Sequence, residues 1–151
     1  MYLFIVLALM LVFPLTSVVV ETLVRDHSVL LWTVFGKWWV FWAVGVRLLL
    51  AGIRQIIQPR YTAETILGIQ GEDVLPVVRE LGFANVAIGS LGVGSLFFPG
   101  WVQPAAVAGM LFYGLAGINH CTHKTRNFKK NIAMTSDIFT ACVMLSFIIH
   151  P

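Results

Sequence analysis

Ionisable and amide side chains recur inside long apolar stretches of this chain, where they could build one polar site. The residues of this kind are Arg47, Arg54, Glu80, Asn85, His120, Asn131 and Asp137. An ionisable group inside a bilayer costs about 2.5–3.5 kcal/mol on insertion scales, so such groups face the interior of a helix bundle. Either arginine would offset the charge of Glu80 or Asp137, because an unpaired buried charge is expelled or neutralised. We take these residues as the candidate lining of a ligand-binding site.

Glu80, His120 and Asp137 are also the candidates for acid–base catalysis, provided that they converge in the fold. A carboxylate beside an imidazole can pass protons to and from a substrate. A neighbouring arginine would hold an anionic group of that substrate. The same side chains could instead form a purely structural network of ion pairs and hydrogen bonds between helices. The sequence leaves these two interpretations open.

Motifs for metal, haem or nucleotide chemistry are weak or missing in the sequence. His120 and His123 stand three residues apart and give half of a metal site, but no second pair lies on the same side of the membrane. A bis-histidine haem site has little support, because His27 and His150 fall on the opposite side. No nucleophile elbow, Walker loop or HExxH motif occurs. We therefore expect no metal site, and the sequence names no cofactor.

The composition identifies the environment of these groups. Of the 151 residues 58% are apolar and 11% are charged, whereas a soluble domain is about 45–50% apolar and about 25% charged. Ten basic and seven acidic side chains are too few to cover the surface of a soluble fold. The chain is therefore expected to be a membrane protein. A disordered chain, a disulfide scaffold and a soluble nucleic-acid-binding domain are excluded.

Five stretches are long enough to cross the hydrocarbon core, which requires about 20 apolar residues. They are Tyr2–Val20, Leu30–Ile57, Val77–Phe98, Trp101–Asn119 and Ile132–Ile149. Only short connections remain, so we predict an all-α, polytopic membrane helix bundle that forms a single domain over residues 1–151. The first stretch lacks the basic residues and cleavage site of a secretory signal. We interpret it as a retained helix; the number of spans falls to four if it is peripheral or removed.

The Lys and Arg residues of the short loops set the orientation of the bundle. Seven such cations lie on the side of the N-terminus and two on the other side. We therefore expect a prokaryotic cytoplasmic membrane protein with its N-terminus in the cytoplasm and its C-terminus outside. At about 1.5 Å per helical residue, all the candidate site residues fall in the cytoplasmic half, and the outer half is almost wholly apolar and aromatic. A single polar cavity open to the cytoplasm is the resulting prediction.

The connections and helix faces predict how the spans pack. Pro99 and Gly100 predict a tight turn, and with it an antiparallel hairpin of the third and fourth spans. In the 58–76 loop the AETILGI stretch predicts a short helix, and Asp73 predicts a helix N-cap. Small residues along the third and fourth spans favour close helix packing. The basic KTRNFKK run attracts anionic lipid headgroups, by about 1 kcal/mol for each cation.

Four stretches taken together carry a resemblance to a known family. They are GKWWVFWAVGVRLLLAGIRQIIQPRYTAETI, RELGFANVAIGSLG, FYGLAGINH and NIAMTSDIF. Over roughly residues 36–140 the chain resembles a family of small, uncharacterised prokaryotic membrane proteins, defined only as a domain of unknown function. More distantly, a compact bundle with an arginine in an early span resembles DoxX-type membrane proteins. The resemblance to an uncharacterised family implies no particular activity, and we do not transfer a quinol-related activity from the DoxX-type proteins.

Two classes of function are compatible with these observations. The first is a binding protein that holds a small molecule or a lipid headgroup in the polar cavity, or an accessory subunit of a larger membrane complex. The alternative is a membrane-embedded enzyme that acts on a lipid or isoprenoid substrate by acid–base chemistry. A carrier ranks last, because inverted repeats and interrupted helices are not evident. The expected partners are the lipid bilayer and this ligand; a homo-oligomer stays open, and nucleic acid is excluded.

Overall fold

The computed structural model describes residues 2–24, 31–122 and 128–150, and every regular element in these ranges is a helix. The first long helix consists of three consecutive segments, α1 (Tyr2–Leu7), η1 (Ala8–Val12) and α2 (Phe13–Val24). The second consists likewise of α3 (Leu31–Trp39), η2 (Val40–Val46) and α4 (Arg47–Ile57). The other elements are η3 (Tyr61–Leu67), α5 (Val74–Gly94), η4 (Pro99–Trp101), α6 (Val102–Thr122) and α7 (Phe128–Ile149).

Five segments within the described ranges are long and apolar enough to cross a membrane. They are Leu3–Val24, Leu31–Ile57, Val74–Gly94, Pro99–Cys121 and Asn131–Ile149, numbered here as spans one to five. They confirm the predicted fold class, an all-α polytopic membrane bundle with five spans. Their ends differ from the predicted ones by up to four residues, because capping and loop geometry, rather than hydropathy, set where a helix ends.

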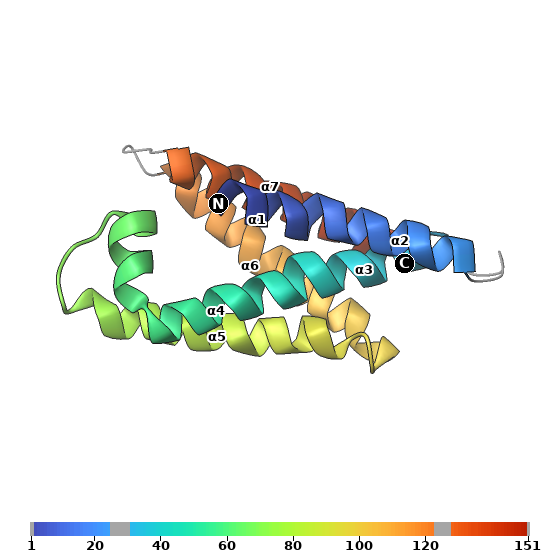
Figure 1. The fold of residues 1–151 in the computed structure, drawn as a ribbon, viewed down its shortest axis with the longest axis horizontal. Coiled ribbons are helices and arrows are strands. Elements are labelled where there is room, and N and C mark those ends of the chain that lie inside the picture. Colours follow the sequence, from blue (N-terminus) through green and yellow to red (C-terminus); the bar gives the residue numbers. More distant parts are fainter. Residues whose placement is uncertain (1, 25–30, 123–127, 151) are drawn as a thin grey trace.

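The spans pack in pairs that differ from the predicted hairpin. α4 packs along α5, α6 packs along α7, and span one lies against α3, η2 and α7 (Figure 1). The turn before α6 is present, but α5 contacts α6 far less than it contacts α4. In Figure 1 the α4–α5 pair and the α6–α7 pair diverge towards the end that carries η3. We call this end the N-terminal side, since span one begins there.

Glycines bring spans two and three into backbone contact. A Cβ atom on Gly92 would lie 2.5 Å from the Cα of Gly45, and one on Gly45 would lie 2.7 Å from the carbonyl carbon of Gly92. One on Gly52 would lie 2.6 Å from the carbonyl oxygen of Gly82. Only a residue without Cβ fits at these positions. The predicted role of small residues in packing span three is therefore confirmed, as expected where lipid removes the usual hydrophobic drive.

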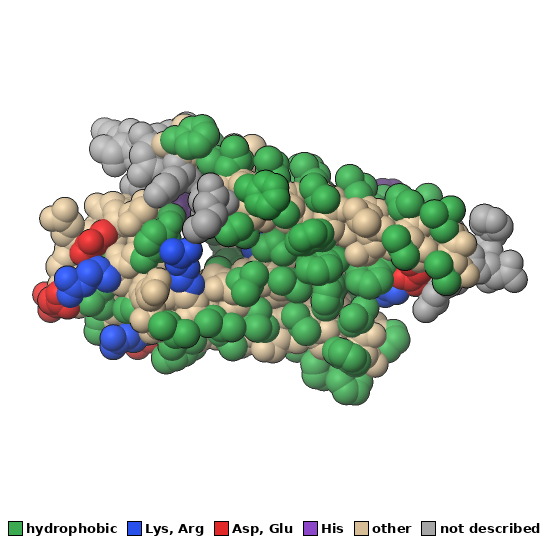
Figure 2. All heavy atoms as spheres, viewed as in Figure 1, with side chains coloured by type: hydrophobic (Ala, Val, Ile, Leu, Met, Phe, Trp, Pro, Cys, Tyr) green, Lys and Arg blue, Asp and Glu red, His purple; other side chains and the backbone are tan. Residues whose placement is uncertain are grey.

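The core lies where spans two, four and five meet, and the exterior is apolar. Val40, Val44, Tyr113 and Met144 are at most 2% exposed, and they belong to one packed cluster. Large apolar side chains elsewhere face outward, for example Leu115, and such side chains cover most of the face in Figure 2. An exposed apolar surface of this extent is compatible with lipid rather than with water.

η1 and η2 are π-helical segments inside spans one and two, and they contact one another. At the end of η2 the backbone N–H of Arg47 donates to the carbonyl of Trp42, five residues earlier, as in a π-turn. η1 lies just before Pro14, which has no N–H to donate to the carbonyl of Met10 and so interrupts the α-helical hydrogen bonds. Segments of this kind often accompany functional sites.

The connection between spans two and three contains the predicted short helix. η3 ends at Gly68, whose φ of 72° is the left-handed conformation that glycine adopts most readily. Asp73 directly precedes α5, as expected of an N-cap, but its side chain makes no capping hydrogen bond. Arg60 and Glu72 form an exposed ion pair across the connection. The short helix is confirmed, and the side-chain cap is not.

Candidate functional site

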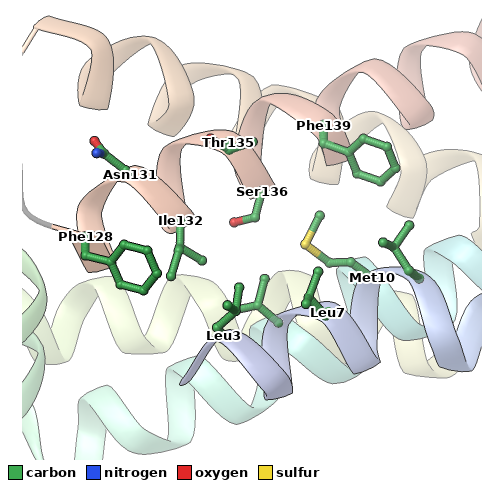
Figure 3. Close-up of a pocket in the computed structure, with 11 residues that line it drawn as sticks. Leu3, Leu7, Met10, Phe128, Asn131, Ile132, Thr135, Ser136 and Phe139 are labelled. Carbon is green, nitrogen blue, oxygen red and sulfur yellow. The ribbon is translucent and has the colours of Figure 1, made fainter. Parts of the chain in front are cut away.

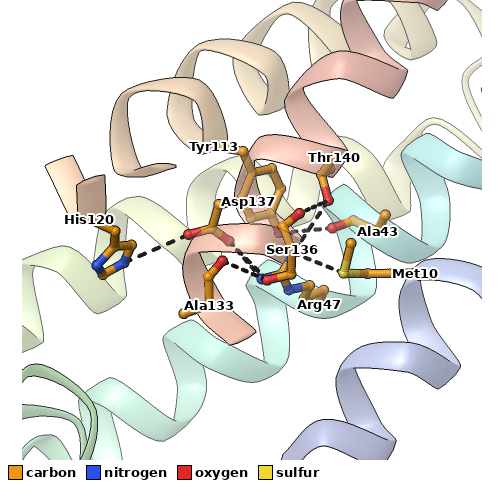
Figure 4. A network of polar contacts seen from close by, with 9 residues as sticks. All are labelled: Met10, Ala43, Arg47, Tyr113, His120, Ala133, Ser136, Asp137 and Thr140. Carbon is orange, nitrogen blue, oxygen red and sulfur yellow. Dashed lines mark hydrogen bonds and ion pairs between the residues drawn. The ribbon is translucent and has the colours of Figure 1, made fainter. Parts of the chain in front are cut away.

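Arg47 is the centre of a polar network inside the bundle (Figure 4). Its Nη2 atom donates to Oδ1 of Asp137 at 2.8 Å and to Oγ of Ser136 at 2.8 Å. Its Nη1 atom lies 3.4 Å from Oγ1 of Thr140 and 3.6 Å from Sδ of Met10. The network thus joins spans one, two and five around a cation that stands about 15 Å from the end of its helix.

One face of α7 supplies most of the acceptors. Ser136 and Thr140 stand four residues apart and therefore lie on the same side of the helix. The hydroxyl of Ser136 donates to the carbonyl of Ala133 at 2.7 Å, and that of Thr140 donates to the carbonyl of Ser136 at 2.8 Å. Because each hydroxyl proton is donated to a backbone carbonyl, the two hydroxyl oxygens can act only as acceptors towards Arg47. Neither hydroxyl was predicted from the sequence, although Ser136 directly precedes Asp137 and Thr140 follows it by three residues.

Tyr113 of α6 packs against the guanidinium of Arg47 at one side of the network. The centroid of its ring lies 4.7 Å from Cζ of Arg47, and its hydroxyl donates to the carbonyl of Ala43 at 2.8 Å. Ala43 belongs to η2, so this bond ties span four to the π-helical segment that precedes Arg47. The aromatic face stabilises the guanidinium where water cannot. Tyr113 was not among the predicted site residues, because an aromatic residue in a span usually indicates packing.

We expect Tyr113→Phe to lower the free energy of unfolding by about 1 kcal/mol, the usual net contribution of one hydrogen bond. The ring under Arg47 would be retained, so the loss isolates the bond to Ala43. The measurement is the midpoint of thermal unfolding of the purified protein in detergent. Tyr113→Leu serves as the comparison, since it removes the ring as well and should cost clearly more. Equal losses for the two variants would contradict this division of roles.

His120 approaches the network from α6. Its Nε2 atom lies 3.8 Å from Oδ2 of Asp137, whereas the other carboxylate oxygen, Oδ1, binds Arg47. This distance is longer than a hydrogen bond, and a polar atom to one side of the two groups can contact both of them. The side chains of Arg47, Asp137 and His120 are 13%, 9% and 15% exposed, so the site is not sealed. Figure 2 shows the surface hollowed on the N-terminal side, between the connection that carries η3 and the α1–α7 layer.

Asn85 lies in a second, separate polar contact. Its Nδ2 atom donates to Oε1 of Gln55 at 2.7 Å, and both side chains are buried between spans two and three. The Oδ1 atom of Asn85 is buried and has no hydrogen-bond partner among the described residues. Gln55 was missed in the sequence because it follows Arg54 directly and stands near the end of its span. This amide pair joins the two helices that the glycines bring together.

The remaining predicted residues lie at the surface. Arg54 is exposed, and its Cζ atom stands 3.7 Å from the ring centroid of Tyr61 in η3. Glu80 is exposed on α5, and Asn131 is exposed at the start of span five. The structure therefore brings Arg47, His120 and Asp137 together. It places Arg54, Glu80, Asn85 and Asn131 outside that cluster.

A polar cluster also lies in the half of the bundle away from the N-terminal side, whereas the sequence predicted that half to be almost wholly apolar and aromatic. Glu21 of α2 accepts hydrogen bonds from Nζ of Lys37 and from the indole of Trp38. One turn away, the indole of Trp42 donates to Oγ of Ser17 at 3.0 Å. This cluster could have been predicted from the opposite charges of Glu21 and Lys37, because one short connection joins the two spans on which they lie. These bonds fasten span one to span two.

Metal-ligating side chains do not cluster in the described ranges: no group of three His, Cys, Asp or Glu residues is placed to hold an ion. His123 and His27 lie outside the described residues, so the half-site with His120 has no structural counterpart here. Cys121 and Cys142 are both exposed and form no disulfide.

Comparison with known protein families gives a match over almost the whole chain. A family model described as a family of unknown function, DUF6790, matches residues 1–150 and so includes every residue of the network. No curated protein and no solved structure matches the chain. The expected membership of an uncharacterised domain family is confirmed. The chain belongs to the DUF6790 family.

Proposed function

We propose that this membrane protein binds a small polar molecule or a lipid headgroup at the cluster of Arg47, Asp137 and His120. The observation that carries the proposal is the convergence of three ionisable groups from three different spans at one incompletely buried point. A bundle held together by packing alone does not need such a cluster, and ionisable groups at this depth usually mark functional sites.

The geometry indicates which chemical group would bind. Oδ2 of Asp137 accepts hydrogen bonds only, while Nε2 of His120 can donate or accept, depending on its protonation. A hydroxyl or amine placed to one side of these two atoms, which are 3.8 Å apart, would donate to the ionised carboxylate and contact the imidazole. Arg47 would hold the carboxylate in place through Oδ1. We therefore favour a ligand with a hydroxyl or amino group.

The Lys and Arg distribution supports entry from the cytoplasm. The cations of the short loops are concentrated on the N-terminal side, which by the positive-inside rule faces the cytoplasm. His120 lies near the end of span four on that same side. In this proposal the protein resides in a prokaryotic cytoplasmic membrane with its C-terminus outside, and the site opens to the cytoplasm.

A membrane-embedded enzyme is the second candidate, and the spacing of His120 and Asp137 supports it. Two titratable groups 3.8 Å apart could exchange a proton with a substrate atom that lies to one side of both. Glu80 has no part in this proposal, because it is exposed on α5. His120→Gln separates the two candidates: an enzyme would still bind its substrate but lose turnover, whereas a binding protein would lose affinity.

Native mass spectrometry of the protein, extracted gently with its own lipids, tests the proposal. We expect a discrete additional mass on the wild-type chain that is lost in the double variant Arg47→Met/Asp137→Leu. The double variant removes both charges together and so leaves no unpaired charge to disturb folding. Arg54→Ala is the matched control, since it removes an exposed cation from the same helix outside the cluster. A bare wild-type chain, or a double variant that keeps every additional mass of the wild type, would refute ligand binding at this cluster.

A further inference from the structure

An apolar groove runs between α1–η1 and α7, and it borders the Arg47 network, with which it shares Met10 and Ser136. It has a volume of about 400 Å³ and is lined on one side by Leu3, Leu7 and Met10, and on the other by Ile132 and Phe139 (Figure 3). We propose that this groove binds one acyl chain of an anionic glycerolipid from the membrane leaflet on the N-terminal side. The inference goes beyond the proposed function and does not depend on it.

The depth of the groove matches one leaflet. Asn131 and Leu3, at one end of the groove, are the first residues of spans five and one. Phe139, at the other end, lies eight residues further along α7, or about 12 Å at the rise of an α-helix. Half of a hydrocarbon core measures about 15 Å. An acyl chain that enters at the membrane boundary would therefore lie along the groove for most of its leaflet.

Two polar side chains in the groove indicate a lipid with ester groups rather than a plain hydrocarbon. Asn131 and Thr135 stand four residues apart, line the groove and are exposed. The hydroxyls of Thr16 and Thr140 donate to a carbonyl four residues earlier in their own helix. In the described part of the chain Thr135 has no such bond. Exposed polar groups at membrane depth need partners, and the ester oxygens of a glycerolipid lie at this depth and accept hydrogen bonds.

Two lysines in the first turn of α7 favour an anionic headgroup. Phe128 and Asn131 both line the groove, and the sequence places Lys129 and Lys130 between them, in the first turn of α7. Each basic residue near a membrane surface contributes about 1 kcal/mol of attraction to anionic lipid. The α1 side of the groove adds only apolar side chains, such as Leu3 and Leu7. In this proposal, cations near the membrane surface attract the headgroup, and the acyl chain packs against the apolar side chains of the groove.

The test is a titration of the delipidated protein in detergent with phosphatidylglycerol or phosphatidylcholine, followed by native mass spectrometry. We expect one phosphatidylglycerol per chain, bound about tenfold more tightly than phosphatidylcholine, because two cations at about 1 kcal/mol each suffice for that ratio. Thr135→Val should weaken the binding of both lipids several-fold. Thr16→Val is the matched control and should leave both affinities unchanged, since Thr16 lies outside the groove.

Two further variants separate the headgroup from the chain. Lys129→Gln/Lys130→Gln should abolish the preference for phosphatidylglycerol, while Arg79→Gln, at an exposed cation of α5, should preserve it. Leu7→Trp should fill the groove and abolish the one-to-one complex. Equal and non-stoichiometric binding of both lipids, or an unchanged complex in Thr135→Val and Leu7→Trp, would overturn the proposal. Loss of the native ligand in Arg47→Met/Asp137→Leu with this lipid complex intact would show that the two sites are separate.

Discussion

Asp137→Leu is expected to lower the free energy of unfolding by about 3–5 kcal/mol, the usual cost of removing one partner from a buried ion pair. Arg47 would keep the neutral hydroxyls of Ser136 and Thr140 but lose the carboxylate of Asp137. A full positive charge would then remain inside the bundle. Unfolding in increasing dodecyl sulfate, followed by loss of helical signal, measures the change.

The double variant Arg47→Met/Asp137→Leu is the control for this prediction. Replacement of a buried ion pair by apolar side chains of similar size is often neutral or stabilising, so the double variant should recover most of the loss. The difference from additivity gives the coupling between the two residues. Two results would contradict a buried pair. Either the single variants Arg47→Met and Asp137→Leu would be as stable as the wild type, or the double variant would lose as much free energy of unfolding as the two single variants together. A stable double variant that keeps every bound molecule would make the network purely structural.

Gly92→Ala is expected to destabilise the bundle by about 3 kcal/mol, at the upper end of the cost of overpacking. Its Cβ would lie 2.5 Å from the Cα of Gly45, and backbone atoms cannot move aside as a flexible side chain can. Spans two and three would have to separate along their length. The same unfolding titration measures the effect.

Gly114→Ala provides the matched control for this second substitution. Gly114 is also a mid-span glycine, yet a Cβ there would meet only the Cβ of Ala141 at 3.8 Å, an ordinary contact. Alanine is favoured over glycine in a helix by up to about 1 kcal/mol, so this variant should be neutral or slightly more stable. If Gly92→Ala behaved like Gly114→Ala, the close contact between spans two and three would be ruled out.

The fold was largely predictable because a bilayer restricts a chain to few structures. Backbone groups in hydrocarbon must bond internally, so each long apolar stretch becomes a helix. The five spans follow from this rule, with errors only at their ends. Helix pairing was harder: the turn at Pro99 indicated a hairpin of spans three and four, but Gly45 and Gly92 make spans two and three the closer pair.

The depth of the site residues followed from the sequence, whereas their direction around each helix did not. The rise per residue placed Arg47 and Asp137 in the same half of the bundle, and the structure brings them together. Arg54 has the spacing to share a face with Arg47, but stacks on Tyr61, which no periodicity within span two could indicate. Ser136 was missed for another reason, since a hydroxyl that bonds its own helix gives no sign that it also accepts from Arg47.

The π-helical segment η2 has a consequence for how this chain can vary. Val40–Val46 follows wider turns than an α-helix, and Arg47 comes immediately after it. Deletion of one residue from this segment would let α-helical turns re-form without shortening the span appreciably. The residues beyond the deletion would keep nearly their direction, because a π-helix winds more residues into each turn than an α-helix does, and Arg47 would still face Asp137. Deletion of one residue from α3 would instead turn α4 by about 100° relative to the start of the span. The stretch from 40 to 46 is therefore the part of span two that can lose one residue without separating the charged pair.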